Sequence, residues 1–421
     1  MMIAYLVVVG LAALFWLGRV FSPSSRMAPR FTYDEGTDPA ALSGIVRGDR
    51  TPRVYAGDPT NEGEKGGEWP TVTVVVPGRN EGRTLLATLD SLCAMDYPHY
   101  RVIFIDDQST DDTPRICRQL ELKYPHLQVI HNTQNPPPGW VGKSWAIHQA
   151  QPETITTDYL LFTDADLHFH RLCLKQMIRL ARHRQSDLLS LLPMVHCYTL
   201  GEKLGLMAGL QLIALACPLR KSNDPRHPQA LVAGGFMLFK RTAYQAVGGH
   251  EAVRRQIIED MAFGALMKKR QRSVYTVGTT DLLTGRMYEG WRDTFHGLKK
   301  NAYAGANYNP LIAVGFTLGT LLLAVLLPVY VLVGIFLWIT QPSLLTFAAL
   351  IGSVLAWSAM LVTARRANRL LRFSHALAWL APLAAGFYLS IFLSSVIEHY
   401  RGGNKWSGRS YEREEVEALS Q

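Results

Sequence analysis

Long apolar segments constrain what this chain can fold into more than any other feature of its sequence. The first, residues 2–18 (MIAYLVVVGLAALFWLG), carries no charged side chain, and three more lie at 311–339, 344–363 and 376–397. A helix of about 20 apolar residues crosses the hydrocarbon core of a bilayer. We therefore expect a membrane protein with an N-terminal transmembrane anchor over residues 1–20. A transmembrane region of about three helices, followed by a basic tail, is expected over 306–421.

The charges next to the first apolar segment predict its orientation. Arg19, Arg26 and Arg30 follow it, whereas a signal peptide carries its positive charge before the apolar segment. We expect the N-terminus outside and the following chain in the cytosol, since basic residues stay on the cytosolic side. A cleaved signal peptide is the alternative.

The charges near the end of the chain point in two directions. Four arginines between the last two apolar segments predict a cytosolic loop: Arg365, Arg366, Arg369 and Arg372. Alternating crossings then place the tail outside, but its sequence, HYRGGNKWSGRSYER, is basic and favours the inside. The segment 311–339 contains Pro328, so a broken or re-entrant helix is the alternative there. The number of crossings stays open.

A different pattern begins after residues 21–70, which are rich in Pro, Gly, Ser and charge and predict a linker. Over 71–305, short apolar segments typical of buried strands alternate with helical patterns, which predicts a parallel sheet covered by helices. The strand candidates are TVTVVVP (71–77), RVIFIDD (101–107), LQVIHN (127–132) and DYLLFTDAD (158–166). The nearly uncharged segment 204–219 predicts either a core helix or a helix at the membrane face.

Composition excludes several classes of function. The net charge is +9, but Lys and Arg flank the apolar segments instead of gathering on one helix or strand, so no nucleic-acid partner is expected. The five cysteines form no CxxC pair, which argues against a disulfide framework and a zinc site.

Carboxylates follow three of the four predicted strands. Glu81 comes after the first strand, Asp106 and Asp107 end the second, and Asp164 and Asp166 end the fourth. Ligands of such sheets bind beyond the carboxyl ends of the strands. Acidic groups gathered there would repel one another unless a cation or the donor groups of a ligand lay among them. Carboxylates, water and phosphate oxygens suit Mg²⁺ or Mn²⁺, so we expect one of these metals with a nucleotide diphosphate.

An ordered set of motifs gives these strand ends a context. PGRNE, IDDQSTDD, GWVGKSWA, FTDADLHF, GGFMLFKR and IIEDMAFG, spread over residues 70–300, resemble those of an inverting family 2 glycosyltransferase. The GWVGKSWA block, the segment 222–225 and the KWSGRSY ending are most similar to hopene-associated and carotenoid-type membrane glycosyltransferases. The resemblance implies an α/β fold: a GT-A (Rossmann-like) catalytic domain with an N-terminal transmembrane anchor and C-terminal transmembrane helices.

The resemblance also implies roles in binding a nucleotide sugar. By position, Glu81 and Asp107 resemble residues that contact the base and ribose, and Asp106 could share this role. Asp164 and Asp166 match the DxD pair that binds the diphosphate through a divalent metal. His168 and His170 continue the period of that pair; they could join the site, but a strand-edge or core position is the more common one.

Three further residues are expected near the donor. Lys143 follows Gly142 in a turn that should open a helix, where a lysine suits a phosphate or a sugar hydroxyl. A solvated lysine at a helix start is the alternative. Gly234 and Gly235 would let the backbone approach the substrate closely.

Glu259 and Asp260 resemble the ED motif of the family, which implies Asp260 as the catalytic base and Glu259 as a nucleotide-sugar-binding residue. An inverting transfer needs one carboxylate to take the proton of the acceptor hydroxyl. The alternative is a pair of carboxylates that only stabilise the first turn of a helix.

The QxxRW motif of processive members is absent; the corresponding region reads GWRDTFHGLKKNAY (290–303). Its Arg292, Lys299 and Lys300 suit either a departing diphosphate or the cytosolic edge of a membrane. We expect transfer of one hexose, from UDP-glucose or a related donor, to a lipid or isoprenoid hydroxyl. The expected location is the inner membrane, with the catalytic domain in the cytosol. The alternatives are a polysaccharide or exopolysaccharide synthase and a catalytically silent scaffold that binds nucleotide sugar.

Overall fold

The computed structural model describes residues 2–21, 68–151, 154–401, 404–406 and 409–411. Almost all of the linker expected over 21–70, and part of the basic tail, lie outside the described residues. The chain forms two compact units, one α/β and one helical. The helical unit takes in two helices, from the segments 200–216 and 290–302, although both fall within the range expected for the catalytic domain.

The α/β unit contains one eight-stranded sheet. Its strands are β1 (Val72–Gly78), β2 (Tyr100–Asp107), β3 (Leu127–Asn132), β4 (Tyr159–Phe162), β5 (Leu167–Phe169), β6 (Leu188–Val195), β7 (Met237–Lys240) and β8 (Val274–Gly285). Its helices are α2 (Leu85–Cys93), α3 (Thr113–Lys123), α4 (Gly142–Gln149), α5 (Cys173–Arg184), α7 (Leu219–Ser222), α8 (Arg241–Ala246), α9 (Gly249–Ala252) and α10 (Glu259–Lys269).

The strand order is β3-β2-β1-β4-β7-β6-β8-β5. The first four strands along this order are parallel, as expected from the alternation of strand and helix patterns in the sequence. Beyond β4 the sheet is mixed, because β7 pairs antiparallel with both β4 and β6, and β5 pairs antiparallel with β8. The predicted parallel sheet is confirmed for β1 to β4 and is wrong for this half, where β6 and β8 pair parallel but β7 and β5 run antiparallel to their neighbours.

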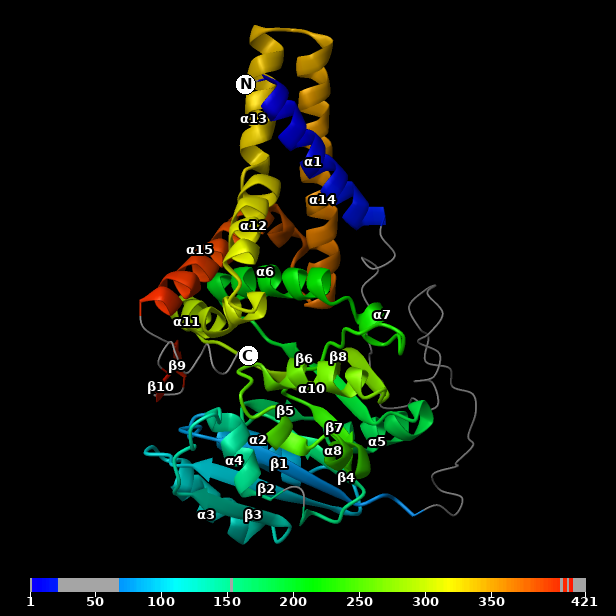
Figure 1. Ribbon diagram of the computed structural model, residues 1–421, viewed down its shortest axis with the longest axis vertical. Coiled ribbons are helices and arrows are strands. Elements are labelled where there is room, and N and C mark those ends of the chain that lie inside the picture. The colour runs from blue at the N-terminus through cyan, green and yellow to red at the C-terminus, as the bar shows by residue number, and fades with distance from the viewer. Residues whose placement is uncertain (1, 22–67, 152–153, 402–403, 407–408, 412–421) are drawn as a thin grey trace. The chain divides into compact units, whose positions relative to one another are not determined.

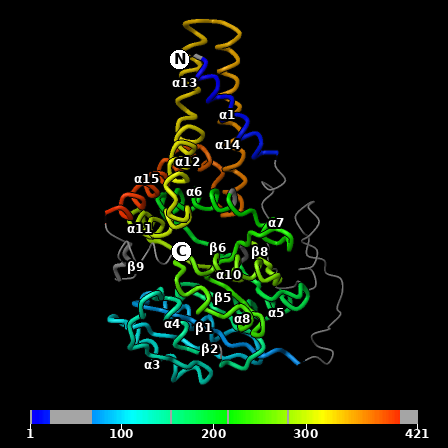
Figure 2. Tube along the Cα trace, in the orientation of Figure 1, coloured from blue at the N-terminus to red at the C-terminus, as the bar shows by residue number. Residues whose placement is uncertain are grey.

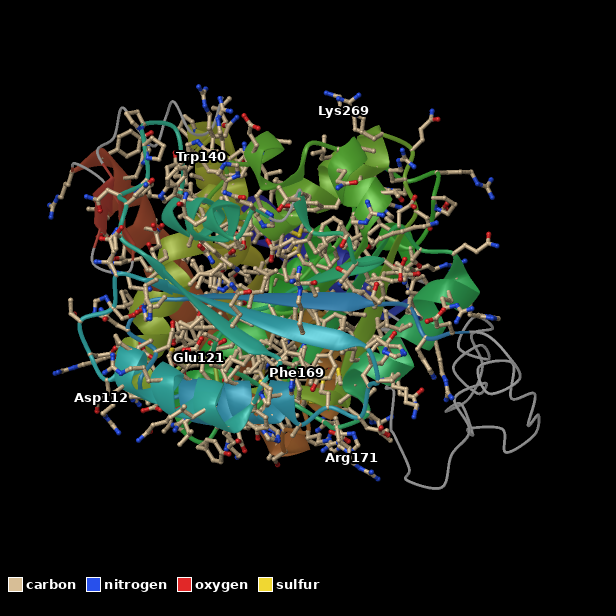
Figure 3. All side chains as sticks on the ribbon, turned by 90° about the horizontal axis from the view of Figure 1, so that it is seen from below. Asp112, Glu121, Trp140, Phe169, Arg171 and Lys269 are labelled. Carbon is tan, nitrogen blue, oxygen red and sulfur yellow. The ribbon has the colours of Figure 1, made fainter. Side chains whose placement is uncertain are left out.

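Helices cover both faces of the sheet, as Figure 3 shows in the view along it, with Asp112 and Glu121 beside α3 on one side and Trp140 near α4 on the other. On the α2–α3–α5 side, Val74, Val76 and Phe104 are fully buried. On the α4–α8–α10 side, Val75 and Ile105 are equally buried. Since successive strand residues point to opposite faces, two apolar layers explain why the strand sequences lack alternation.

The helical unit contains the apolar segments. Its elements are α1 (Met2–Phe21), α6 (Leu200–Ala216), α11 (Gly290–Ala302), the 3₁₀ turn η4 (Ala304–Ala306), α12 (Pro310–Thr320), the π turn η5 (Leu321–Val325), α13 (Leu327–Thr340), α14 (Leu344–Leu370), the 3₁₀ turn η6 (His375–Leu380), α15 (Ala381–Tyr400) and the short hairpin β9 (Asn404–Trp406) with β10 (Arg409–Tyr411). Figure 1 shows α13 and α14 as a hairpin with α1 along it. Figure 2 shows α6, from the middle of the chain, among the helices of the last third.

Within the described residues, three helical segments are long and apolar enough to cross a membrane: Ile3–Phe21, Leu344–Leu370 and His375–Tyr400. A fourth is reached if the pair Gly290–Ala306 and Pro310–Val325, bent by 119°, counts as one span. The segment 311–339 is broken, because α12 runs into the π turn before α13 begins. Pro328 lies in the first turn of α13, where a backbone N–H has no partner within the helix, so the N–H that proline lacks is not missed.

The structure bears on two expectations about the helical unit, the arginine loop and the segment 204–219. Arg365, Arg366 and Arg369 belong to the last turns of α14 and not to a loop, because the helix continues to Leu370. The segment 204–219 forms most of α6, whose Leu204 and Met207 are buried in the core of the helical unit. One side of the helix is therefore part of the core of this unit, and a position at the membrane face stays a prediction for its exposed side, which carries Leu200 and Ile213.

Candidate active site

The loops that follow β1 and β2 are tied to each other at the carboxyl edge of the sheet. Asn80 has a positive φ of 57°, donates its N–H to Ser109 Oγ at 2.9 Å, and accepts the Thr110 N–H on Oδ1 at 2.8 Å. The Glu81 N–H donates to Thr113 Oγ1 at 2.9 Å. Asn tolerates the left-handed region better than most residues, which fits its use in this turn. Glu81 is thereby held beside the end of β2.

Asp106 and Asp107 are both buried, with 4% and 6% of their surfaces exposed. Asp106 Oδ1 accepts the Ser109 N–H at 3.1 Å, and its Oδ2 lies 3.0 Å from His131 Nδ1. Asn132 Nδ2 donates to Asp107 Oδ1 at 2.7 Å. The end of β3 therefore orients both carboxylates of β2, a positioning function that the sequence alone did not suggest for His131 and Asn132.

The stretch from Asp164 to Asp166 is a turn and not the extended backbone expected from its alternating carboxylates, because β4 ends at Phe162. Thr88 Oγ1 fixes the turn by donating to the carbonyl of Ala165 at 2.9 Å. Burial, then the negative charges of Asp164 and Glu81, raise the pKa of Asp166 to about 7. The structure thus brings Glu81 into the electrostatic environment of the DxD pair.

Lys143 lies between two carboxylates. As expected, α4 begins at Gly142, and its second residue sends Nζ to within 2.6 Å of both Asp164 Oδ1 and Glu259 Oε1. Burial alone would lower the pKa of Lys143, but the two carboxylates outweigh it and hold that pKa well above its ordinary value. Lys143 is therefore a charged, partly buried bridge and not the solvated lysine of the alternative interpretation.

Asp260 is oriented by backbone amides. Gly234 N–H donates to its Oδ2 and Met261 N–H to its Oδ1, each at 2.7 Å. Burial first, and the neighbouring Glu259 second, raise the pKa of Asp260 to about 7. A carboxylate of this kind can take up a proton near neutral pH, which is the property a general base needs.

The two glycines have separate structural reasons. A Cβ on Gly234 would lie 3.2 Å from Lys143 Nζ and 3.3 Å from Asp260 Oδ2, so a side chain there would intrude among the charged groups. A Cβ on Gly235 would lie 2.7 Å from Leu167 Cδ1, a clash within the core. The structure therefore explains both glycines by contacts within the chain; the expected approach to a substrate stays a prediction.

The remaining candidates lie elsewhere. His168 is exposed on β5, and His170 Nδ1 accepts the Leu172 N–H at 3.3 Å in the turn before α5. Lys299 belongs to the helical unit, where its Nζ pairs with Glu398 at 2.5 Å. Arg292 and Lys300 are exposed on the same helix.

Arg79 is a residue that the sequence interpretation passed over. It directly follows β1, and its Nε and Nη1 are buried without a hydrogen-bond partner among the described residues. An unpaired buried donor is costly, so an acceptor from a ligand is a natural partner for this guanidinium. Its place within the PGRNE motif was the available signal.

The described residues contain no group of three or more His, Cys, Asp or Glu side chains that could hold a metal ion by themselves. Asp164 and Asp166 nevertheless fit a cation that takes its other ligands from phosphate and water, as Mg²⁺ usually does. Burial first, and the charge of Asp164 second, raise the pKa of Asp166, and a bound cation would offset both effects.

Residues 73–248, which include Lys143 and the acidic strand ends but not Glu259 and Asp260, match the Glycosyl transferase family 2 model. The chain contains a glycosyl transferase family 2 domain. It is 27% identical over 243 residues to a 4,4'-diaponeurosporenoate glycosyltransferase of Staphylococcus haemolyticus, an alignment covering 56% of this chain and 62% of that protein. A beta-monoglucosyldiacylglycerol synthase of Nostoc is 36% identical over 90 residues, which cover 21% of this chain and 19% of the relative. The chain thus spans less than two thirds of either relative.

A solved mannosyltransferase from Pyrobaculum calidifontis, in complex with GDP-Man and Mn²⁺, shares the fold. The TM-score is 0.51 at 17% sequence identity, covering 94% of this chain and 98% of that one. The expected GT-A fold, the family 2 domain and the similarity to carotenoid-type glycosyltransferases are confirmed.

Proposed function

We propose that this protein is a membrane-anchored inverting glycosyltransferase that moves one hexose from a nucleotide sugar to a hydroxyl of a lipid or isoprenoid acceptor. The observation that carries the proposal is the cluster in which Lys143 joins the DxD turn to the Glu259–Asp260 pair. The raised pKa of Asp260, next to Glu259 in the sequence, supports its proposed role as the base. The names of the relatives, which act on a carotenoid acid and a diacylglycerol, support a lipid acceptor.

In this proposal the nucleoside is bound by Glu81, Asp106 and Asp107, and the diphosphate by Asp164 and Asp166 through Mg²⁺ or Mn²⁺. The metal would neutralise the charge that develops on the departing diphosphate. UDP-glucose is the proposed donor, because the name of the Nostoc relative, a beta-monoglucosyldiacylglycerol synthase, includes a glucosyl group. The structural relative was solved with GDP-Man, so a guanosine donor is the competing choice.

Asp260 would carry the proton transfer. The acceptor oxygen attacks the anomeric carbon as the bond to the diphosphate breaks, and the hydroxyl proton passes to Asp260. Its carboxylate enters this step already oriented by the N–H groups of Gly234 and Met261. A positioned base of this type contributes about 10² to 10⁴ in rate.

The proposed location is the inner membrane, with the catalytic domain in the cytosol. The arginines at the end of α14 and Arg19 near the end of α1 lie at helix ends that contact each other, since Arg366 Nη1 donates to the Val20 carbonyl at 2.9 Å. Basic residues gathered at one end of a helix bundle favour the cytosolic side for that end.

The test is an assay of the purified full-length protein in lipid. UDP-glucose and GDP-mannose would be offered in parallel, with Mn²⁺ or Mg²⁺ and with polyprenol, a hydroxylated carotenoid or diacylglycerol as acceptors. Formation of a glycolipid with a single added hexose of inverted configuration is expected. A ladder of longer products would indicate a polysaccharide synthase, and nucleotide binding without transfer to any acceptor would indicate a silent scaffold.

A further inference from the structure

The bridge formed by Lys143 joins segments that are far apart in the sequence. Asp164 lies in the turn after β4 and Glu259 is the first residue of α10, yet each has an oxygen 2.6 Å from the same ammonium group. The loop before α4 is also fixed to the segment before α10, because Val141 N–H donates to the Arg254 carbonyl at 2.8 Å. Lys143 and Glu259 therefore meet as parts of one rigid corner.

The two carboxylates of the bridge differ in exposure. The side chain of Glu259 is 7% exposed, whereas that of Asp164 is 38% exposed. A buried carboxylate is costly without a cation beside it, so Glu259 depends on Lys143. Asp164 has access to solvent and can exchange the ammonium for another cation at lower cost. The bridge is therefore asymmetric in burial, with a buried end at Glu259 and a more exposed end at Asp164. Lys143 Nζ donates a hydrogen bond to Asp164 Oδ1, whereas its contact with Glu259 Oε1, equally short, is an ion pair without hydrogen-bond geometry.

We infer that Glu259 is a positioning residue that anchors Lys143, and that Lys143 presents its ammonium to the diphosphate of the donor when that ligand occupies the DxD turn. The inference rests on the proposed function and deepens it. It gives Glu259 a different role from the direct donor contact that the family resemblance implies. The free protein uses Asp164 as a temporary partner of Lys143, while Glu259 keeps the side chain extended toward the site.

The space around the bridge supports a fixed anchor. A Cβ on Gly234 would lie 3.2 Å from Lys143 Nζ, 3.3 Å from Asp260 Oδ2 and 3.6 Å from Glu259 Oε1, so all three side chains pack closely around this backbone position. Such close packing leaves few alternative rotamers for Glu259. Asp164, at the edge of the cluster, does not share this restriction.

A double-mutant cycle tests the inference. Lys143→Gln, Glu259→Gln and the combined variant would be prepared as full-length protein, and the affinity for UDP and GDP would be measured with Mn²⁺ in addition to the transfer rate. Each single variant is expected to lose about tenfold in nucleotide affinity. Because Glu259 acts through Lys143, the combined variant should bind no more than about threefold more weakly than Lys143→Gln, a marked failure of additivity.

Controls separate this role from a general loss of structure. Lys175→Gln removes a lysine whose Nζ lies 3.5 Å from Asp96 at the surface, and it should change neither affinity nor rate. Thermal unfolding of every variant shows which of them fold. If the neutral variants do not fold, the variant that combines Lys143→Arg with Glu259→Asp keeps both charges and should show part of the nucleotide affinity of the unchanged protein.

Two results would overturn the inference. The first is multiplication of the two single losses in the combined variant. The second is a Glu259→Gln variant that keeps its nucleotide affinity but loses transfer, because Glu259 would then act on the reaction directly. Failure of the proposed function gives a different result. If the protein transfers no sugar but shows the coupled loss of nucleotide affinity, the anchoring role of Glu259 stands and the proposed glycosyltransferase function is wrong.

Discussion

At the scale of single residues, Asp260 gives the sharpest prediction. Asp260→Asn should reduce transfer by about 10² to 10⁴, because the amide cannot accept the proton of the acceptor hydroxyl. Nucleotide affinity should stay within about threefold of the unchanged protein, since the hydrogen bonds of the Asp260 carboxylate come from the N–H groups of Gly234 and Met261 and not from the DxD turn. Unchanged turnover would show that another group is the base.

The pH dependence of the same residue follows from its environment. Burial and Glu259 raise the pKa of Asp260 to about 7 from an ordinary value of 3.8. A base works in its deprotonated form, so kcat/KM should rise with pH and level off above about pH 7. A profile measured between pH 5 and 9 checks this; a rate that is flat down to about pH 5 would contradict a base with this pKa.

For Arg79 we predict that one substitution raises the stability of the ligand-free protein and lowers its affinity for nucleotide. Its buried Nε and Nη1 have no partner among the described residues, so Arg79→Met should stabilise the ligand-free protein by about 1 kcal/mol. If the guanidinium pairs with the donor, the same variant should bind nucleotide diphosphate about tenfold more weakly. Thermal unfolding and nucleotide titration measure the two effects. Arg115→Met, at an exposed arginine of α3, is the matched control and should change neither.

At the scale of elements, α1 is built into the helical unit. Trp16 is 7% exposed, its Nε1 donates to the Leu323 carbonyl in the π turn at 2.5 Å, and Tyr5 Oη donates to the Tyr330 carbonyl at 2.6 Å. Trp16→Ala should destabilise the protein in detergent by about 3 kcal/mol. Trp16→Phe should lose about 1 kcal/mol for the hydrogen bond. Leu14→Ala, at a position 72% exposed, is the control on the same helix. Equal effects at positions 14 and 16 would argue against this packing.

The strands and helices differ in how well the sequence predicts them. The strands β1 to β4 were predictable because each is a short segment rich in apolar residues and followed by polar residues, and their carboxyl ends located most of the candidate site. The strands β5 and β7 have three and four residues and pair antiparallel with partners distant in the sequence. No local pattern of apolar residues predicts strands this short. The bridge from Lys143 to Glu259 is missed for the same reason, since it depends on how α4 and α10 meet in the folded sheet.

At the scale of the whole molecule, the arrangement of α1, α14 and α15 in the helical unit bears on which side of the membrane the tail lies. The last turns of α1 and α14 meet through Arg366 and the Val20 carbonyl, so both helices reach the same basic end. α15 begins just after that end. Figure 1 shows α15 inclined across the direction of the α13–α14 hairpin, where it lies beside α6 and α11. Lys299 of α11 pairs with Glu398 near the last turn of α15, which places charges where a span would leave the bilayer.

This arrangement favours α15 lying along the membrane face, although its segment is long enough to cross. The tail would then remain on the cytosolic side, in agreement with its basic sequence and against the count of alternating crossings. A green fluorescent protein fused after residue 421 should therefore fluoresce, because it folds in the cytosol. An alkaline phosphatase fused at the same position should be inactive, and activity of that fusion would mean that α15 crosses the membrane. The same pair of fusions placed in the turn between α13 and α14, at Ser343, should give the opposite result and serves as the control for topology.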